Sequence, residues 1–215
     1  MRIILVRHGE TVWNRQGRLQ GMLSGPTTLR GRRQVKRISR LLAGERVAHV
    51  FSSDLKRAQD AAREIAIFHN APVEFLPQLR EINCGVLEGK SLQSARKTHR
   101  AIVEARLRDK YNYCIPGGES YGDVEKRVRP FLLRLKRNFA NKTVIVVSHE
   151  AVSRVILKIL LKLAPKDAVR VSQPNDCIYR LNVPLHGKGK TAAEHYCKNS
   201  RGKGLLWEKA ATPLK

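Results

Sequence analysis

Two short apolar runs that end in the same way constrain the fold of this chain more than any other feature. Residues 3–6 are all Ile, Leu or Val and lead directly into Arg7 and His8. Residues 143–147 are β-branched throughout and lead into Ser148 and His149. Apolar runs without polar alternation are typical of parallel strands that are covered on both faces. We therefore expect an α/β sheet in which each histidine follows a buried strand.

Two other charged side chains are predicted at the ends of further strands. A strand over residues 47–51 leads, through a cap at residues 52–54, into a helix that carries Arg57 in its first turn. A loop that follows a short strand at residues 73–76 carries Glu81. In open α/β sheets the ligand crevice lies outside the carboxyl ends of the strands. One site is therefore expected to be surrounded by Arg7, His8, Arg57, Glu81 and His149.

The rest of the chain alternates between loops and helical periodicity, with turn residues between them. The expected elements are a loop over residues 10–26, an amphipathic helix over 28–42, a mostly helical region over 91–138, an apolar helix over 152–163 that ends before Pro165, and a strand over 178–183.

The chain length indicates a single domain. With 215 residues it is long enough to bury one sizeable core and short for two. We predict a catalytic domain over residues 1–185. The Lys- and Gly-rich residues 186–215 form a basic C-terminal segment that packs on this domain or trails from it.

The net charge is unusual. Lys and Arg number 42 against 18 Asp and Glu, which gives a formal net charge of +24. Such a surface attracts anions, among them phosphorylated metabolites, phosphoproteins, polyphosphate and nucleic acid, and this attraction weakens with salt. The alternative is a basic solvated surface without a specific partner, because surface charge alone specifies no ligand.

The chain carries no pattern typical of secreted or membrane proteins. No apolar stretch approaches the roughly 20 residues that span a bilayer, and the first strand begins too early for a leader peptide. A cytoplasmic location is expected. The four cysteines show neither C-x-x-C nor zinc-ligand spacing and are expected to be reduced thiols: Cys84, Cys114, Cys177 and Cys197.

The five residues at the strand ends suit phosphoryl transfer. Arg7 and Arg57 can bind phosphate oxygens in bidentate fashion. An unprotonated His8 can attack phosphorus, and a cationic His149 would stabilise the charge on the equatorial oxygens. Glu81 can protonate the leaving alkoxide and later take a proton from water. These residue types predict a phosphatase that needs neither a metal nor another cofactor.

A metal site built from His8, Glu81 and His149 is the competing interpretation. Imidazole and carboxylate groups do bind divalent cations. Two guanidinium groups in the same pocket, from Arg7 and Arg57, would repel such an ion. The phosphate site is therefore preferred.

Taken in order, the motifs of this chain resemble those of the histidine phosphatase superfamily, also called the phosphoglycerate mutase-like clan. The resemblance extends from the first strand to about residue 160. It rests on residues 5–11, Trp13 and Asn14, residues 17–21, residues 52–58, residues 79–82 with Gly85, Glu88 and Gly89, residues 116–120, and residues 147–150.

This resemblance implies a fold and a set of roles. The fold is a three-layer α/β/α sandwich with a mostly parallel sheet and one antiparallel edge strand. It implies a phosphohistidine at His8, an acid/base at Glu81, and a phosphate pocket that contains Arg7, Arg57 and His149. Further substrate-binding residues are expected at Asn14, Gln20, Gly21 and Glu150.

The resemblance favours a compact phosphatase of broad-specificity or α-ribazole phosphatase type that acts on small phosphorylated metabolites. Cofactor-dependent phosphoglycerate mutases of the clan carry a longer insertion between the acid and the second histidine than the interval from Glu81 to His149. A mutase, and a phosphatase that binds phosphoproteins or other polyanions, remain as alternatives. The sequence specifies neither the physiological substrate nor the oligomeric state.

Overall fold

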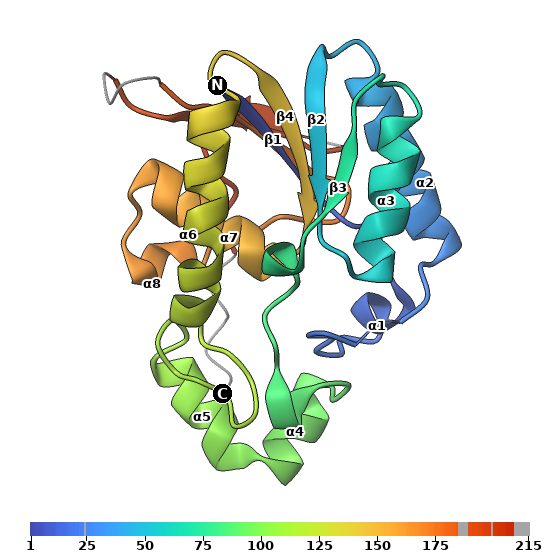
Figure 1. Cartoon of the computed structure of the whole chain (residues 1–215). Helices are drawn as coiled ribbons and strands as arrows, with labels where there is room; N and C mark the ends of the chain where they lie inside the picture. Colours follow the sequence, from blue (N-terminus) through green and yellow to red (C-terminus); the bar gives the residue numbers. More distant parts are fainter. Residues whose placement is uncertain (24, 185–188, 199, 209–215) are drawn as a thin grey trace.

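A computed structural model describes residues 1–23, 25–184, 189–198 and 200–208. Within these ranges the chain forms one seven-stranded sheet with the order β3-β2-β4-β1-β5-β6-β7 (Figure 1). The strands are β1 (Arg2–Arg7), β2 (Val47–Ser52), β3 (Val73–Phe75), β4 (Thr143–Ser148), β5 (Ile178–Asn182), β6 (Ala192–Tyr196) and β7 (Arg201–Lys203). The pairs β3-β2, β2-β4 and β4-β1 are parallel, as the apolar runs predicted.

Helices cover both faces of the sheet, which confirms the expected three-layer sandwich (Figure 1). One layer consists of α2 (Leu29–Leu42) and α3 (Lys56–Ala66), and the other of α6 (Tyr121–Asn138) and α7 (Glu150–Leu161). The shorter helices are α1 (Val12–Arg15), η1 (Pro77–Leu79), η2 (Gly85–Leu87), α4 (Leu92–Thr98), α5 (Arg100–Arg108) and α8 (Pro165–Ala168).

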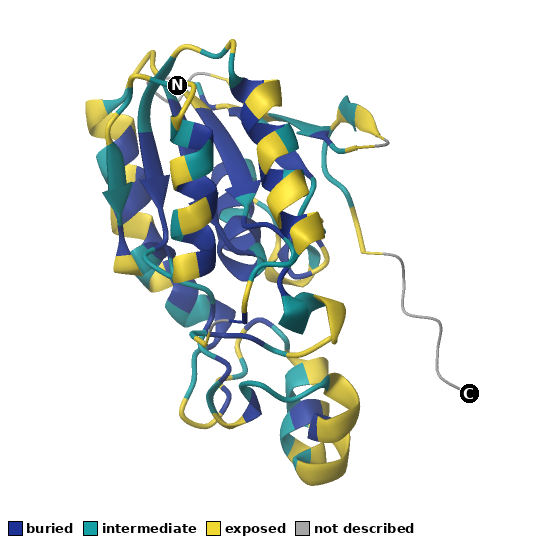
Figure 2. Ribbon diagram, turned by 90° about the vertical axis from the view of Figure 1, so that its right-hand side faces the viewer, coloured by how far each residue is buried: buried dark blue, intermediate teal, exposed yellow. Residues whose placement is uncertain are grey.

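The apolar run of β1 serves two separate cores. Ile3 and Leu5 pack in the cluster that contains α6 and α7, whereas Ile4 and Val6 pack in the cluster that contains α2 and α3. Successive side chains of a strand point to opposite faces, so a strand covered on both faces has no polar position. Figure 2 shows the resulting buried sheet between helices whose outer surfaces are exposed.

Register brings the ends of β1 and β4 together. Arg7 on β1 pairs with Ser148 on β4, and the amide of His8 donates to the carbonyl of Ser148 at 3.2 Å. His8 and His149 are therefore the first residues beyond two neighbouring parallel strands. The sheet alone places them side by side.

The cap predicted for the helix after β2 is not formed. Helix α3 begins at Lys56, and its N-cap residue is Leu55, which has no side chain able to accept a hydrogen bond. The hydroxyl of Ser53 accepts from the amide of Leu55 at 3.2 Å, before the helix, and also lies 2.9 Å from Nε2 of His149. The carboxylate of Asp54 binds Arg80 in bidentate fashion.

Two further boundaries differ from the sequence-based expectation. The loop over residues 10–26 contains the single-turn helix α1, which Thr11 and Asn14 close with a reciprocal capping box. Helix α7 begins at Glu150 and ends at Leu161, where Lys162 turns the chain with a left-handed φ of 56°. Pro165 therefore begins α8 rather than ending α7.

The antiparallel edge of the sheet contains three strands rather than the one expected. β5 pairs antiparallel with β1, β6 with β5 and β7 with β6. Residues 192–196 and 201–203 of the basic C-terminal segment thereby extend the sheet. The predicted boundary between the catalytic domain and the C-terminal segment, at residues 185 and 186, lies outside the described residues. The same holds for residues 187–188, 199 and 209–215 of that segment.

The prediction of four reduced thiols is wrong for two of them, because Cys177 and Cys197 form a disulfide. The antiparallel register pairs Ile178 with Tyr196, so the next residues outward on the two strands face each other. Cys84 and Cys114 are free.

Disulfides persist mainly in oxidising compartments, so the cytoplasmic location stays a prediction. Among the described helices, none has the length and apolar character needed to cross a bilayer.

Candidate active site

A cavity of about 340 Å³ opens beyond the ends of β1 and β4. All but one of the residues predicted for the site line it: Arg7, His8, Asn14, Gln20, Gly21, Arg57, Glu81 and Glu150. The exception, His149, is fully buried directly beside His8, with the two ring centroids 5.1 Å apart. The predicted convergence of the strand ends is therefore present in the structure.

The orientation of the His8 imidazole is fixed by a backbone carbonyl. Its Nδ1 lies 2.8 Å from the carbonyl oxygen of Gly9. A carbonyl only accepts hydrogen bonds, so Nδ1 carries the proton and Nε2 keeps its lone pair. Burial lowers the pKa of His8 well below its ordinary value, and the charges of Arg57 and Arg7 lower it further. His8 is therefore neutral near pH 7.

The imidazole of His149 is also neutral. Burial is the main reason that its pKa lies well below the ordinary value, and Arg57 and His8 act in the same direction. Its Nε2 lies 2.9 Å from the hydroxyl of Ser53, and its buried Nδ1 has no partner among the described residues. The cationic form considered from the sequence requires a nearby anion to stabilise it.

Both arginines are held by backbone carbonyls. Nη1 of Arg7 donates to the carbonyl of Gln173 at 2.8 Å, and its buried Nε has no partner within the described part of the chain. Arg57 donates to the carbonyls of Leu23 at 2.6 Å and Gly21 at 2.8 Å. Guanidinium groups held in this way need little reorganisation to receive an anion.

Glu81 is a buried carboxyl group whose pKa is raised, and burial is the dominant cause. Its Oε1 accepts from the amide of Ile82 at 2.9 Å and from the amide of Ala151, in the first turn of α7, at 3.2 Å. The hydrogen bond from Ile82 and the charges of Arg57 and Arg7 oppose the rise in pKa. A carboxyl group with a raised pKa can act as a proton donor.

Helix α1 and the loop that follows it contribute three of the predicted binding residues. Oδ1 of Asn14 accepts within the capping box, which leaves its amide nitrogen without a partner among the described residues. Gln20 is buried, and its Oε1 also lacks a partner there. Gly21 has a φ of +51°, and a Cβ at this position would lie 1.8 Å from Oε1 of Glu88. Only glycine fits at residue 21 without displacing that carboxylate.

The carboxylate of Glu150 positions Arg7. Its carboxylate lies 3.2 Å from Nη1 of Arg7 and 3.6 Å from Nη2 of Arg154, and it accepts from the amide of Gln173 at 3.3 Å. These contacts fix Arg7 from two sides, because the carbonyl of Gln173 binds the same guanidinium group.

The sequence did not indicate several residues around the cavity. Gln173 and Asn175 precede β5, and Asn175 donates from Nδ2 to the carbonyl of His8 at 2.7 Å. Arg106, Lys110 and Arg154 line the cavity with Tyr121. The sequence places Arg106, Lys110 and Tyr121 in the segment 91–121, which is expected to line the outer pocket, but no motif singles them out. Arg154 follows Glu150 by one helical turn, and this spacing is a sequence signal for its position.

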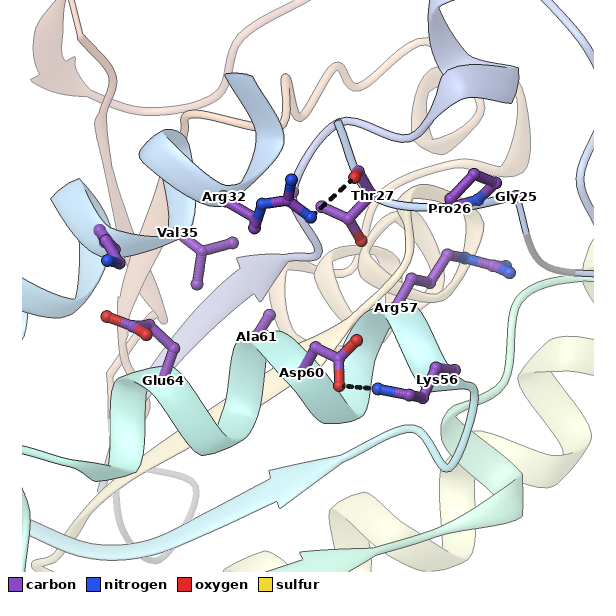
Figure 3. A pocket seen from close by; sticks show the side chains of 12 residues that line it. Gly25, Pro26, Thr27, Arg32, Val35, Lys56, Arg57, Asp60, Ala61 and Glu64 are labelled. Atoms are coloured by element: carbon purple, nitrogen blue, oxygen red, sulfur yellow. Dashed lines mark hydrogen bonds and ion pairs between the residues drawn. The ribbon is translucent and has the colours of Figure 1, made fainter. Parts of the chain in front are cut away.

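A second cavity, of about 640 Å³, lies between α2 and α3 (Figure 3). Among the five proposed catalytic residues, only Arg57 lines it, together with Gly9, Gly25, Pro26, Thr27, Arg32, Val35, Lys36, Lys56, Asp60, Ala61 and Glu64. In Figure 3 the side chains of Lys56 and Asp60 are paired with each other. The cavity at the strand ends is therefore the candidate active site.

On this α/β sheet, a neutral imidazole that shares its cavity with two arginines is the arrangement of an enzyme that cleaves phosphate esters, a phosphatase. The chain belongs to the histidine phosphatase superfamily, branch 1, whose family model matches residues 3–195.

Comparisons with known proteins give the same family. The chain is 31% identical over 182 residues to a probable phosphoglycerate mutase GpmB of Yersinia enterocolitica, covering 85% of each protein. It is 29% identical to phosphoserine phosphatase 1 of Hydrogenobacter thermophilus, covering 86% of this chain and 94% of the relative. The solved α-ribazole phosphatase from Shigella flexneri superposes with a TM-score of 0.79 at 26% identity, covering 89% of this chain and 93% of that one.

Proposed function

We propose that this protein is a metal-independent phosphomonoester hydrolase that works through a phosphohistidine at His8. The observation that carries the proposal is the state of this imidazole: neutral, with Nδ1 bound to the carbonyl of Gly9 and Nε2 available, beside Arg7 and Arg57. Such a nitrogen is a competent nucleophile towards a phosphate bound by the two guanidinium groups.

In the first step, Nε2 of His8 attacks phosphorus as the bond to the ester oxygen breaks. Protonated Glu81 gives its proton to the departing oxygen, so that an alcohol leaves rather than an alkoxide. In the second step, Glu81 takes a proton from water, whose oxygen attacks the phosphohistidine. Inorganic phosphate is released, and His8 returns to its neutral form.

Arg7 and Arg57 would bind the equatorial oxygens of the transferred group throughout both steps. The partnerless Nε of Arg7 and the partnerless Nδ1 of His149 are two nitrogens available for this purpose. A bound phosphate supplies the negative charge that raises the pKa of His149, so its cationic form would accompany substrate binding. The amide of Asn14 and the side chain of Gln20 are proposed to complete the binding site.

A small phosphorylated metabolite is the proposed substrate class. The cavity of about 340 Å³ lies partly under residues of α4 and α5, which favours a small molecule over a folded phosphoprotein. The relatives named as phosphoserine phosphatase and α-ribazole phosphatase support the same class. The net charge of +24 would increase the local concentration of any such anion.

A mutase is the second candidate, because a relative named as a probable phosphoglycerate mutase is 31% identical. The two activities are distinguished by incubating the protein with 3-phosphoglycerate, with and without a bisphosphorylated primer. A phosphatase releases inorganic phosphate in both reactions. A mutase forms 2-phosphoglycerate and is stimulated by the primer.

The proposal is tested with p-nitrophenyl phosphate in the presence of EDTA. We expect turnover by the wild type, no turnover by His8→Ala, and a phosphoprotein band after acid-free rapid quenching that is absent from His8→Ala. Activity that survives in His8→Ala, or that EDTA abolishes, would exclude the proposed mechanism.

A further inference from the structure

A tight turn that precedes β5 lies beside the strand end that carries the proposed nucleophile. The amide of Cys177 donates to the carbonyl of Pro174 at 3.0 Å, which closes a β-turn over residues 174–177. The antiparallel pairing of β1 with β5 ends at Val6 and Ile178. The turn therefore continues the chain at the point where this pairing stops, next to the residues that follow Val6.

Two residues of this segment hold the catalytic strand end. Asn175 donates from Nδ2 to the carbonyl of His8 at 2.7 Å. From the side of β4, the carbonyl of Ser148 accepts from the amide of His8 at 3.2 Å. The carbonyl of Gln173 accepts from Nη1 of Arg7 at 2.8 Å. One short segment therefore fixes both the backbone of the nucleophile and the guanidinium group beside it.

The side chain of Gln173 ties this segment to the turn and to the sheet. It is buried, and its Nε2 donates to the carbonyls of Leu5 at 3.1 Å and Cys177 at 3.4 Å. The amide of Gln173 donates to Oε1 of Glu150 at 3.3 Å. The position of Gln173 therefore depends on the position of Cys177.

The turn ends at a disulfide bond. Cys177 is buried and is bonded to Cys197, the first residue after β6. The ends of secondary-structure elements open more easily than their middles, and a covalent cross-link restricts such opening. On the opposite side, Arg37 of α2 donates to the carbonyl of Asp176. The disulfide and this hydrogen bond together hold the turn against the end of β1.

A reductant can reach the disulfide from the surface. Cys197 is partly exposed. The residues next to the two cysteines, Asp176 and Lys198, line an outer cavity of about 370 Å³ with Arg30, Arg33, Gln34 and Arg37. Thiol–disulfide exchange requires access of a thiolate to one of the sulfur atoms. The Sγ of Cys197 is the accessible one.

We propose that Gln173 and Asn175 are positioning residues for the phosphoryl transfer and that the disulfide keeps them in place, so that its reduction slows the reaction. The inference rests on the proposed hydrolase function and adds a redox regulation of the same site. In the oxidised protein, Asn175 fixes the backbone of His8 and Gln173 fixes Arg7. In the reduced protein, the turn loses its covalent anchor and both contacts loosen.

The redox step is an exchange with a dithiol reductant. One thiolate of the reductant attacks Sγ of Cys197, the bond between the two cysteine sulfurs breaks, and Cys177 leaves as a thiolate that takes up a proton. The second thiolate of the reductant then attacks the mixed disulfide, and Cys197 leaves and is protonated in turn. Two electrons and two protons pass to the protein, and the dithiol becomes a cyclic disulfide.

The first test compares the oxidised wild type with the same protein after reduction by dithiothreitol. The temperature is one at which circular dichroism shows that the reduced protein is folded. We expect kcat/KM for p-nitrophenyl phosphate to fall about 10-fold, because a misplacement of about 1 Å can cost up to about 100-fold. The inhibition constant for inorganic phosphate should rise, because Arg7 loses a fixed partner. Reoxidation should restore both values.

Two cysteine variants control this comparison. Cys177→Ser should have the activity of the reduced wild type, with and without dithiothreitol. Cys114→Ser, which removes an exposed free thiol, should respond to dithiothreitol as the wild type does.

Asn175→Ala tests the contact with His8 while the disulfide stays intact. Loss of one hydrogen bond should lower kcat/KM by about 5- to 10-fold. The inhibition constant for inorganic phosphate should stay within about twofold, because both arginines keep their partners. Reduction should lower kcat/KM of Asn175→Ala by a smaller factor than that of the wild type, since one of the two contacts is already absent. Asp176→Asn is the matched control, because Asp176 belongs to the same turn but lines the outer cavity.

The outcomes separate this inference from the proposed function. Equal kcat/KM of the oxidised and the reduced wild type would overturn the inference and leave the hydrolase intact. An Asn175→Ala variant that equals the wild type would overturn it as well, as would one that loses phosphate affinity as strongly as kcat/KM. If no phosphomonoester is hydrolysed, the hydrolase proposal fails and calorimetric titration with inorganic phosphate decides: weaker binding to the reduced protein supports the inference, and equal binding overturns it.

Discussion

The imidazole rings of His8 and His149 lie with their centroids 5.1 Å apart at the ends of two hydrogen-bonded parallel strands. Their spacing follows from the register of β1 and β4, in which Arg7 pairs with Ser148. The two imidazoles are thus placed by backbone hydrogen bonds between two fully covered strands of the sheet. Such placement favours a rigid, preorganised site.

The first prediction concerns pH. His8 attacks only when neutral, and its pKa lies well below 6.5, so the acidic limb of the kcat/KM profile should lie below pH 6.5. Glu81 must be protonated for the first step, and its pKa is raised from 4.5, so activity should fall as the pH rises through that raised value. Glu81→Gln should lose this alkaline limb. The ionisation of the substrate affects the wild type and Glu81→Gln equally. The difference between their two pH profiles therefore reports the ionisation of Glu81.

The second prediction concerns the leaving group. Removing a general acid costs about 10²–10⁴-fold when the departing oxygen needs a proton. Glu81→Gln should therefore lose about 100-fold or more in kcat/KM with glycerol 3-phosphate but much less with p-nitrophenyl phosphate, whose phenolate leaves unaided. The ratio kcat/KM is compared because it does not include the later hydrolysis of the phosphohistidine, in which Glu81 also takes part. Equal losses with the two substrates would show that Glu81 does not protonate the leaving group.

The third prediction uses two glycines that both have left-handed backbones. Gly17 has a φ of +63°, and no atom lies within 4 Å of a Cβ added there. Gly17→Ala should therefore lower the free energy of unfolding only by the strain of a left-handed alanine backbone, about 1 kcal/mol. Gly21→Ala should be more destabilising, because its Cβ would collide with Glu88. Its kcat/KM should also fall, since the carbonyl of Gly21 holds Arg57. Thermal unfolding and steady-state kinetics measure the two effects, and similar behaviour of the two variants would contradict the steric argument.

The fourth prediction concerns the disulfide. Cys177→Ser should lower the free energy of unfolding by about 3 kcal/mol, as expected for closure of a loop of about 20 residues. Dithiothreitol should lower the Tm of the wild type and leave that of Cys177→Ser unchanged. Cys114→Ser, which removes an exposed free thiol, is the control. Alkylation of all four cysteines in the unreduced, unfolded wild type would show that the disulfide is not formed.

The fifth prediction concerns Ser53, whose hydroxyl lies 2.9 Å from Nε2 of His149. Ser53→Ala leaves this nitrogen buried without a hydrogen-bond partner. An unsatisfied buried polar group lowers the free energy of unfolding by about 1–3 kcal/mol. We expect a lower Tm and a kcat reduced by about 10-fold, because His149 loses its orientation. A kcat equal to that of the wild type would show that His149 needs no such support.

The parts of the site that could be predicted from the sequence are those fixed by strand ends. An apolar strand followed by a polar residue locates His8 and His149 without further knowledge, because the carboxyl ends of parallel strands share one edge. Arg106 and Lys110 could not be found in this way. They reach the cavity only because α5 folds over it, and neither periodicity nor spacing within the helix encodes that packing.

The C-terminal edge was unpredictable for a different reason. Residues 192–196 read Ala-Ala-Glu-His-Tyr, which has neither the alternation nor the β-branched side chains that indicate a strand. They pair because β5 presents an open edge, and the bond between Cys177 and Cys197 follows from that register. Tertiary context, rather than local preference, determines this part of the fold.

Because the apolar side chains of β1 are divided between two cores, this strand can accept few substitutions during evolution. Ile3 and Leu5 belong to one core and Ile4 and Val6 to the other, so a replacement at any of these four positions disturbs the packing on one face of the strand that leads into His8. The helices α4 and α5 lie away from β1 (Figure 1). New substrates can be acquired by altering those outlying helices while the inherited chemistry at the strand ends is preserved.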